Sequence, residues 1–108
     1  MLNIACTNEQ KHGVIVAPQT IGGRPAAIDG ALTVTVVSGD GTVEQDPGTP
    51  LEFKAVSGDS VETDTVYDVA GDADLGAGVV TIHDTVTLHV TSASAVSFGL
   101  SAGLIEQK

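Results

Sequence analysis

Three aspartates in one short segment have the residue type best suited to binding a hard metal ion. Asp68, Asp72 and Asp74 lie close together in the chain, beside Gly71 and Gly76. Carboxylate oxygens are the ligands that Ca²⁺ prefers. The segment lacks the spacing and the closing glutamate of a twelve-residue calcium loop. The sequence therefore favours solvated carboxylates at the end of a hairpin, with a calcium site as the weaker alternative.

Histidines are the second group that could bind a metal ion, and two of the three lie on one predicted strand. His83 and His89 are six positions apart, which places their Cα atoms roughly 20 Å apart in an extended strand. Two imidazoles at that separation cannot share one ion, and only His12 from another strand could join either of them. We expect surface histidines among threonines, and no metal or other cofactor.

Nucleophilic chemistry has little support in the sequence. The single cysteine, Cys6, cannot form an intrachain disulfide, and its neighbours offer no base that would activate a thiolate. We expect it to be a small buried hydrophobic residue. The chain has neither a G-x-S-x-G elbow nor a phosphate-binding loop. The sequence therefore predicts a protein that is not an enzyme. Catalysis would need a pocket that joins a histidine to an acid.

Short runs in which apolar and polar residues alternate predict strands along the chain. These strands would have to position any residues that carry chemistry. In the run 31–37, Leu32, Val34 and Val36 share one face and Thr33 and Thr35 the other, which is the period of a half-buried strand. Ser38-Gly39-Asp40-Gly41 and Ser57-Gly58-Asp59-Ser60 have the composition of turns. Further strands are predicted over residues 2–6 and 11–18, near Val43, and over 51–55.

The most regular part of the sequence predicts a hairpin. The runs 65–74 and 79–91 are extended, and Leu75-Gly76-Ala77-Gly78 joins them. Asp84 falls on the apolar side of the second run, so we expect either a bulge or a barely covered end there. Seven or eight short strands separated by turns are typical of an antiparallel β-sandwich. We therefore predict an all-β, Ig-like sandwich formed by one domain over residues 1–108, with its core at about 9–91.

The composition excludes several classes of partner. Fourteen acidic residues against four basic ones give a net charge of −10, and binding to nucleic acid or anionic membranes needs clustered Lys and Arg. We expect neither as a partner. The sequence contains no basic segment followed by a long apolar run of the secretory type, so we expect synthesis in the cytoplasm.

The segment that follows the hairpin is apolar and extended. Val96, Phe98 and Leu100 occupy alternate positions within residues 95–105. Such a segment must either close the sandwich or dock on a neighbouring subunit. The candidates for contact with another protein are the apolar residues near the two chain ends, Leu2, Ile4, Val96, Phe98, Leu100, Leu104 and Ile105.

Three segments carry a resemblance to a known family. They are Gly23-Arg24-Pro25-Ala26-Ala27-Ile28-Asp29-Gly30-Ala31, Val37-Ser38-Gly39-Asp40-Gly41-Thr42-Val43, and Ala70-Gly71-Asp72-Ala73-Asp74-Leu75-Gly76-Ala77-Gly78 with the strand 82–90 that follows. In these segments the chain resembles the bacterial Ig-like domains that occur as small stand-alone structural proteins of tailed bacteriophages. The tryptophan often seen on the third strand of that family is replaced by Val34 or Val36, and the segment 96–105 is additional.

The resemblance implies a sandwich that binds other proteins, often on capsids or fibres. We expect a virion protein, most simply a decoration or cement protein that binds and stabilises a phage head. Its expected partners are the major capsid protein or other virion proteins, with copies assembled on the particle, for example as trimers. The alternative is an adhesion module for a host surface or a carbohydrate, on a phage fibre or tail. Tyr67 is the aromatic residue expected to form a sugar platform in that case.

Overall fold

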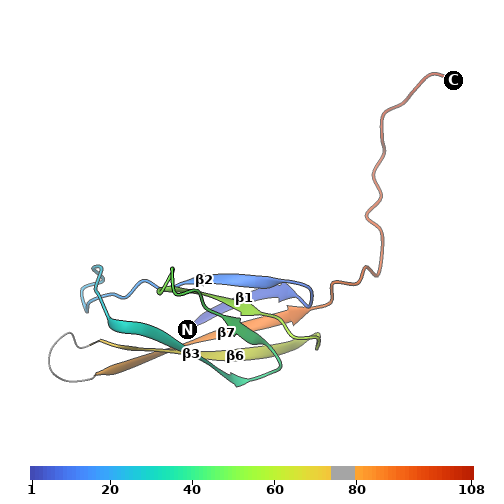
Figure 1. Cartoon of the computed structure of the whole chain (residues 1–108). Helices are drawn as coiled ribbons and strands as arrows, with labels where there is room; N and C mark the ends of the chain where they lie inside the picture. Colours follow the sequence, from blue (N-terminus) through green and yellow to red (C-terminus); the bar gives the residue numbers. More distant parts are fainter. Residues whose placement is uncertain (74–79) are drawn as a thin grey trace.

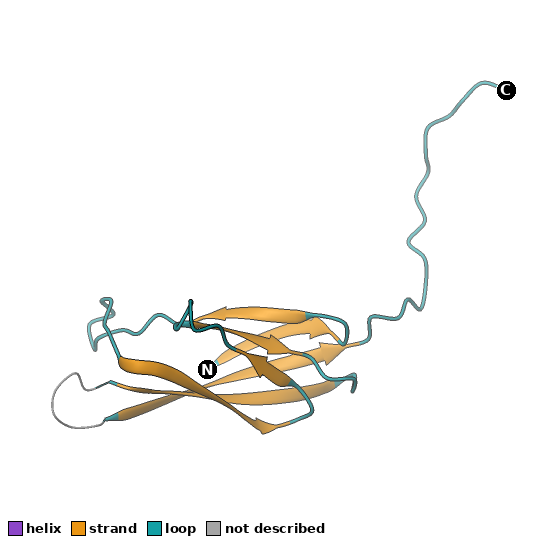
Figure 2. Cartoon of the chain, in the orientation of Figure 1, coloured by secondary structure: helices purple, strands orange, loops and turns teal. Residues whose placement is uncertain are grey.

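In the computed structural model, two β-sheets pack face to face and a single extended segment leaves them (Figure 1). The structure describes residues 1–73 and 80–108. The four-stranded sheet has the order β1-β7-β6-β3 and the three-stranded sheet the order β2-β5-β4. Their bounds are β1 Leu2–Thr7, β2 Lys11–Ile15, β3 Asp29–Ser38, β4 Thr42–Glu44, β5 Glu52–Val56, β6 Thr63–Asp72 and β7 Thr81–Thr91. The prediction of an all-β sandwich is confirmed, and Figure 2 shows strands joined by loops throughout the described residues.

The strand order is that of an immunoglobulin-like sandwich. Strands β3, β6 and β7 form one layer and β2, β5 and β4 the other, which matches the C-F-G and B-E-D layers of that fold. The sheet neighbours are antiparallel except for β1, which runs parallel to β7 from the pair Leu2 and Val86 to the pair Thr7 and Thr91. The first strand thus crosses to the sheet that contains the last strand and extends it.

The core contains the apolar residues of the inward faces. On β6, Thr65, Tyr67 and Val69 are buried and alternate with more exposed residues. Strand β7 contributes Val86, Leu88 and Val90 in the same way. The remaining buried apolar residues come from the neighbouring strands and the opposite sheet, namely Val14, Leu32, Val34, Phe53 and Ala55. Because most of these side chains are small, the core is made of many modest contacts around two large residues, Tyr67 and Phe53.

The predicted hairpin is confirmed in its two strands. The pairing of β6 with β7 runs from Thr63 opposite Val90 to Asp72 opposite Thr81 without a shift in register. Leu75-Gly76-Ala77-Gly78, the expected connection, lies outside the described residues. The even register means that Asp84 causes no bulge. Instead, residues 81–84 form an exposed end of β7, and Asp84 Oδ1 lies 2.8 Å from the amino-terminal nitrogen of Met1.

The two Ser-Gly-Asp turns lie against each other at one end of the sandwich. Asp40 Oδ2 accepts a hydrogen bond from the Ser60 N–H at 3.0 Å, and this bond holds the pKa of Asp40 below its ordinary value. A Cβ added to Gly58 would meet the Asp40 carboxyl group, so the close approach requires a glycine there. Gly39 has a φ of 93°, a conformation that other residues rarely adopt. The predicted turns therefore form, and they also contact each other.

Candidate protein-contact site

The candidate contact residues near the C-terminus lie on a segment that belongs to neither sheet. Residues 92–108, called the tail from here on, contain no strand and extend away from the sandwich (Figure 1). They account for the long dimension of a molecule that measures 79 × 30 × 26 Å. Of the two alternatives that the sequence left open, the tail does not close the sandwich.

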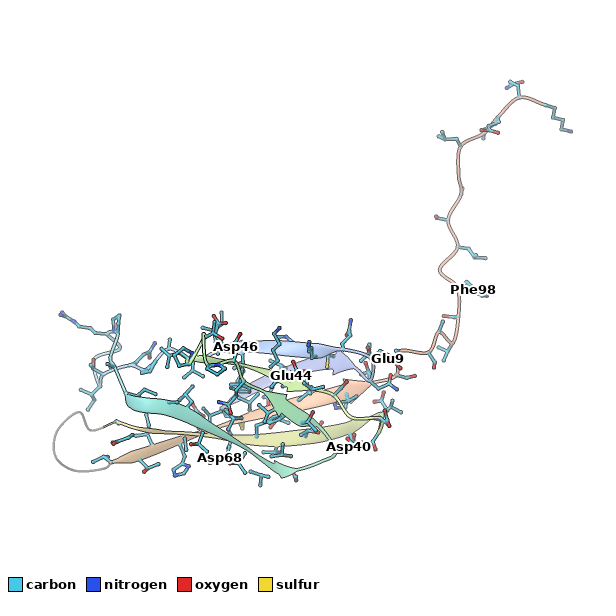
Figure 3. The ribbon with its side chains drawn as sticks, viewed as in Figure 1. Glu9, Asp40, Glu44, Asp46, Asp68 and Phe98 are labelled. Carbon is cyan, nitrogen blue, oxygen red and sulfur yellow. The ribbon has the colours of Figure 1, made fainter. Side chains whose placement is uncertain are left out.

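The large apolar side chains of the tail are almost fully exposed. Their exposed fractions lie between 88% and 96%, and Phe98 projects from the tail well clear of the sandwich (Figure 3). Scattered apolar residues are normal on protein surfaces, whereas a contiguous apolar group of this kind marks an interaction site. The group consists of Val96, Phe98, Leu100, Leu104 and Ile105.

The first residues of the tail, 92–94, are held in place by hydrogen bonds and are called its root from here on. The Asn8 N–H donates to the Thr91 carbonyl at 2.9 Å, and Asn8 Oδ1 accepts a hydrogen bond from the Ala93 N–H at 2.9 Å. The Ser94 N–H donates to Ser92 Oγ at 3.1 Å. Asn8 follows β1 directly, and β1 runs parallel to β7. The C-terminal ends of these two strands therefore lie side by side. Sequence reasoning missed Asn8, since its partner lies 85 positions away and no local pattern signals the contact.

Charge is segregated between the sandwich and the tail. Thirteen of the fourteen acidic residues precede residue 92, and the fourteenth is Glu106. Glu9, Asp40, Glu44, Asp46 and Asp68 are distributed over the sandwich (Figure 3). Residues 92–105 contain no charged side chain. The tail can therefore enter an apolar site without the desolvation of a charge, while the sandwich remains hydrated.

The candidates near the N-terminus lie in β1 and differ from the tail. Leu2 is 45% exposed. Ile4 is half-buried and packs against the core. The two residues pair with Val86 and Leu88 of β7, so β1 is a paired edge strand of the four-stranded sheet. Only Leu2 of this pair presents much apolar surface.

The predicted acidic group is not assembled as one site in the part of the chain that is described. Asp68 pairs with His83, whose Nδ1 lies 3.0 Å from Asp68 Oδ2. Asp72 Oδ1 accepts a hydrogen bond from the Val80 N–H at 3.1 Å. Asp74 lies outside the described residues. Among those that are described, no group of three or more His, Cys, Asp or Glu residues is arranged to hold a metal ion.

The histidines of β7 lie on the outer face of the four-stranded sheet. Each pairs with an aspartate of β6, and His89 also lies near Glu62, which directly precedes β6. His89 Nδ1 lies 2.7 Å from Asp64 Oδ1, and its Nε2 lies 3.5 Å from Glu62. The hydrogen bond to Asp64 raises the pKa of His89, with a further contribution from Glu62. His12 is elsewhere, where its Nδ1 donates to the Gly13 carbonyl at 2.7 Å. The prediction of surface histidines was right about exposure, but it did not foresee these acidic partners.

Cys6 is half-buried at the inner side of β1, and its position does not activate a thiolate. Its side chain packs against the core, and the Sγ lies 3.6 Å from the Gln10 carbonyl. Burial raises the pKa of the thiol. A raised pKa lowers the thiolate fraction at neutral pH.

Tyr67 is wholly buried, which corrects the expectation of an exposed sugar platform. Its exposed fraction is 0%, and its hydroxyl donates to the Thr42 carbonyl at 2.8 Å. Its ring lies 6.3 Å from the ring of Phe53. Burial, together with Cys6 and Asp40, raises the pKa of Tyr67 to about 12. The alternating pattern of β6 places Tyr67 inward, and its hydroxyl reaches a backbone acceptor there.

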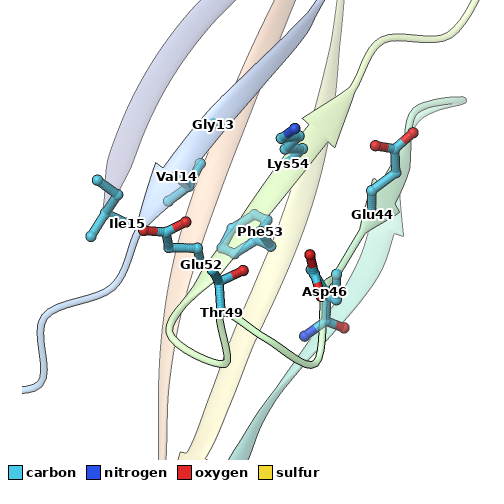
Figure 4. A pocket seen from close by; sticks show the side chains of 10 residues that line it. Gly13, Val14, Ile15, Glu44, Asp46, Thr49, Glu52, Phe53 and Lys54 are labelled. Atoms are coloured by element: carbon cyan, nitrogen blue, oxygen red, sulfur yellow. The ribbon is translucent and has the colours of Figure 1, made fainter.

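The larger described hollow lies over the three-stranded sheet and is lined by Val14, Ile15 and Phe53 as well as by charged residues. It has a volume of about 430 Å³. Figure 4 shows Glu52 and Lys54 beside the buried ring of Phe53, with Glu44 and Asp46 across the opening. Ligand pockets usually enclose most of their ligand's surface, whereas this hollow is open to solvent and bordered by charged side chains.

A second hollow of about 250 Å³ lies where the two sheets diverge, beside Val16 and Ile82. His83 and Asp84 are also at its lining. Neighbouring residues of a strand point to opposite faces, and the His83 imidazole is paired with Asp68. The hollow therefore does not join the histidine and the acid as a catalytic pair.

Comparison with family models, curated proteins and solved structures finds no match to this chain. Among the described residues no helix could span a membrane.

Proposed function

We propose that the chain is a non-enzymatic structural protein of a virion, which binds a phage head through its tail and decorates and stabilises it. The observation that carries this proposal is the uncharged stretch 92–105 of the tail, whose large apolar side chains are 88–96% exposed. Exposed apolar surface of that extent is unfavourable in water unless a partner covers it.

The arrangement of the molecule supports adhesion. The sandwich holds the root of the tail through Asn8, and the tail reaches well beyond the sandwich. Fully burying a Val, Leu or Phe side chain contributes about 1.5–3 kcal/mol each, but ordering an extended segment offsets much of that gain. A single tail contact is therefore modest. Copies repeated over a symmetric shell increase the effective affinity without any new type of contact.

The choice of a phage head as the target rests on the resemblance of three sequence segments to bacterial Ig-like virion domains. The expected partner is the major capsid protein or another virion protein. The acidic sandwich supports this choice indirectly, because it opposes nucleic acid as a partner and keeps a surface-bound domain hydrated.

The adhesion module for carbohydrate is not proposed, since the aromatic residue expected to form its platform is buried. Tyr67 and Phe53 are in the core, and Phe98 stands on the tail without fixed polar groups around it. A sugar site needs polar groups placed beside its stacking surface.

The proposal is tested by adding purified protein to phage heads that lack it and measuring occupancy by electron microscopy. A chain truncated after Ser92 is expected to lose occupancy. A second variant keeps the length of the tail but carries Val96→Ser, Phe98→Ser and Leu100→Ser, and it should also lose occupancy. Full occupancy by the truncated chain would overturn the proposal.

A further inference from the structure

The tail has two faces when it is extended, and they differ in size. Because side chains alternate along a strand, Val96, Phe98, Leu100, Ala102 and Leu104 share one face. The opposite face consists of Ala95, Ser97, Gly99, Ser101 and Gly103. Within residues 95–104, one face therefore offers large apolar groups for a groove, and the other has no side chain larger than serine. Ile105, the next residue, falls on the side of the small face. A strand formed by residues 95–104 and bound by its large face would leave only small side chains in solvent.

The backbone of this segment is free to form a sheet ladder. No hydrogen bond within the described residues involves positions 95–108. Residues 92–105 also contain no Lys and no Pro, the residues that natural proteins place on exposed strands to prevent pairing with another chain. The segment thus retains its donors and acceptors in the form that strand pairing needs.

The tail cannot satisfy this backbone by continuing in its own sheet beside its nearest strands. Strand β7 already has β1 on one side and β6 on the other, and Asn8 directs the chain outward at Ala93. A second copy of the chain is also a poor acceptor, since each copy has a net charge of −10 and like charges oppose close association.

We propose that residues 95–104 bind as an added edge strand on an open sheet edge of another protein, with the large face in an apolar groove along that edge. This inference rests on the proposed function and specifies how the tail is recognised. The partner is a protein other than this chain, with an uncharged or basic exposed strand. Main-chain hydrogen bonds supply affinity in such strand addition, and pockets for alternate side chains supply specificity.

A proline scan with matched alanines tests strand addition, with phage heads that lack the protein as the probe. In a strand, the N–H groups of alternate residues point to the same side. The small-face variants are Ser97→Pro and Ser101→Pro, and the large-face variants are Val96→Pro and Leu100→Pro. Each is compared with alanine at the same position, which keeps the N–H. Proline on one face should weaken binding about fivefold or more relative to its alanine control, because it removes one hydrogen bond to the partner. Proline on the other face should match its control.

The outcomes separate this inference from the proposed function. If truncation after Ser92 abolishes binding but no proline exceeds its alanine control, strand addition is wrong and the proposed function stands. Equal proline losses on both faces would also overturn an edge strand. If truncation leaves binding intact, the proposed function itself fails. The last measurement is the oligomeric state of the purified chain by sedimentation. An oligomer that forms only when the tail is present would show that the tail binds a second copy, and it would overturn the assigned partner.

Discussion

Asn8 and Ala93 are hydrogen-bonded across 85 positions of sequence, with the Ala93 N–H donating to Asn8 Oδ1 at 2.9 Å. The bond joins the turn after β1 to the residue at which the tail departs. A second bond, from the Asn8 N–H to the Thr91 carbonyl, links the same two segments. Together they fix where the tail begins relative to the sandwich.

Replacing Asn8 by alanine should release the root of the tail without unfolding the sandwich. The lost hydrogen bond is exposed, so the free energy of unfolding should fall by no more than about 1 kcal/mol. The Ala93 amide should exchange faster with solvent, and its order parameter in NMR relaxation should fall. Asn8→Asp retains the acceptor oxygen and serves as the control. Unchanged exchange at Ala93 in Asn8→Ala would show that the bond does not hold the root.

Tyr67 should make the fold sensitive to alkali. Its pKa is raised to about 12 in the folded chain from the ordinary value of 10.0. The folded state therefore holds the phenolic proton in a range where the unfolded state releases it. By linkage, the stability associated with Tyr67 is fully present below pH 10 and is lost as the pH rises toward 12.

The alkaline effect can be measured by phenolate absorbance, because Tyr67 is the only tyrosine of the chain. We expect the absorbance to rise together with unfolding rather than before it. Tyr67→Phe should reduce this loss of stability in alkali. At neutral pH the same variant should cost about 1 kcal/mol, for the bond to the Thr42 carbonyl. Titration of Tyr67 near pH 10 in folded protein would contradict its burial.

Gly41 should tolerate no side chain. A Cβ at this position would lie 2.8 Å from Tyr67 Oη and 2.9 Å from the side chain of Thr65. Both neighbours are fully buried, so the structure must shift to admit a methyl group. Gly41→Ala is expected to destabilise the sandwich by about 1–3 kcal/mol in urea denaturation, the usual cost of overpacking. Gly13→Ala is the control, since a Cβ there meets nothing within 4 Å. Equal effects of the two substitutions would contradict the packing around Gly41.

His89 should titrate above its ordinary pKa of 6.5 because its imidazolium is bonded to Asp64. The pair contributes stability that is present below pH 6.5 and is lost as the pH rises through the raised pKa in the folded state. An NMR titration of the His89 ring should show that Asp64→Asn lowers this pKa. Asp68→Asn, which removes the partner of His83 instead, is the matched control and should leave the His89 titration unchanged. A His89 titration that Asp64→Asn leaves unchanged would exclude the pairing as its cause.

Several features of the fold followed from local sequence patterns. The alternation of Leu32, Val34 and Val36 with Thr33 and Thr35 predicted β3, because the two faces of a strand are set by a period of two residues. Glycine and aspartate predicted the two turns, since their conformational preferences act within a few residues. The apolar alternation of Val96, Phe98 and Leu100 is also a property of the sequence alone, and it identified the candidate site in the tail.

Contacts between distant residues could not be read in the same way. The sequence placed Asp84 on the apolar face of β7 and left open a bulge or a barely covered end, and the structure decides for the exposed end. It showed an aromatic residue at Tyr67 but not its burial, which depends on the opposite sheet. The pairs of His83 with Asp68 and His89 with Asp64 arise only when β6 lies beside β7.

By itself, the sequence determined that the chain forms strands, where most of them lie, and that residues 92–105 are uncharged and rich in apolar side chains. Local preferences and side-chain alternation are sufficient for those properties. The tertiary structure decided that β1 joins β7 in parallel, that both sides of β7 are thereby occupied, and that Asn8 directs the tail outward. These outcomes depend on which strands meet, and that choice is made by packing and hydrogen bonding between residues far apart in the chain.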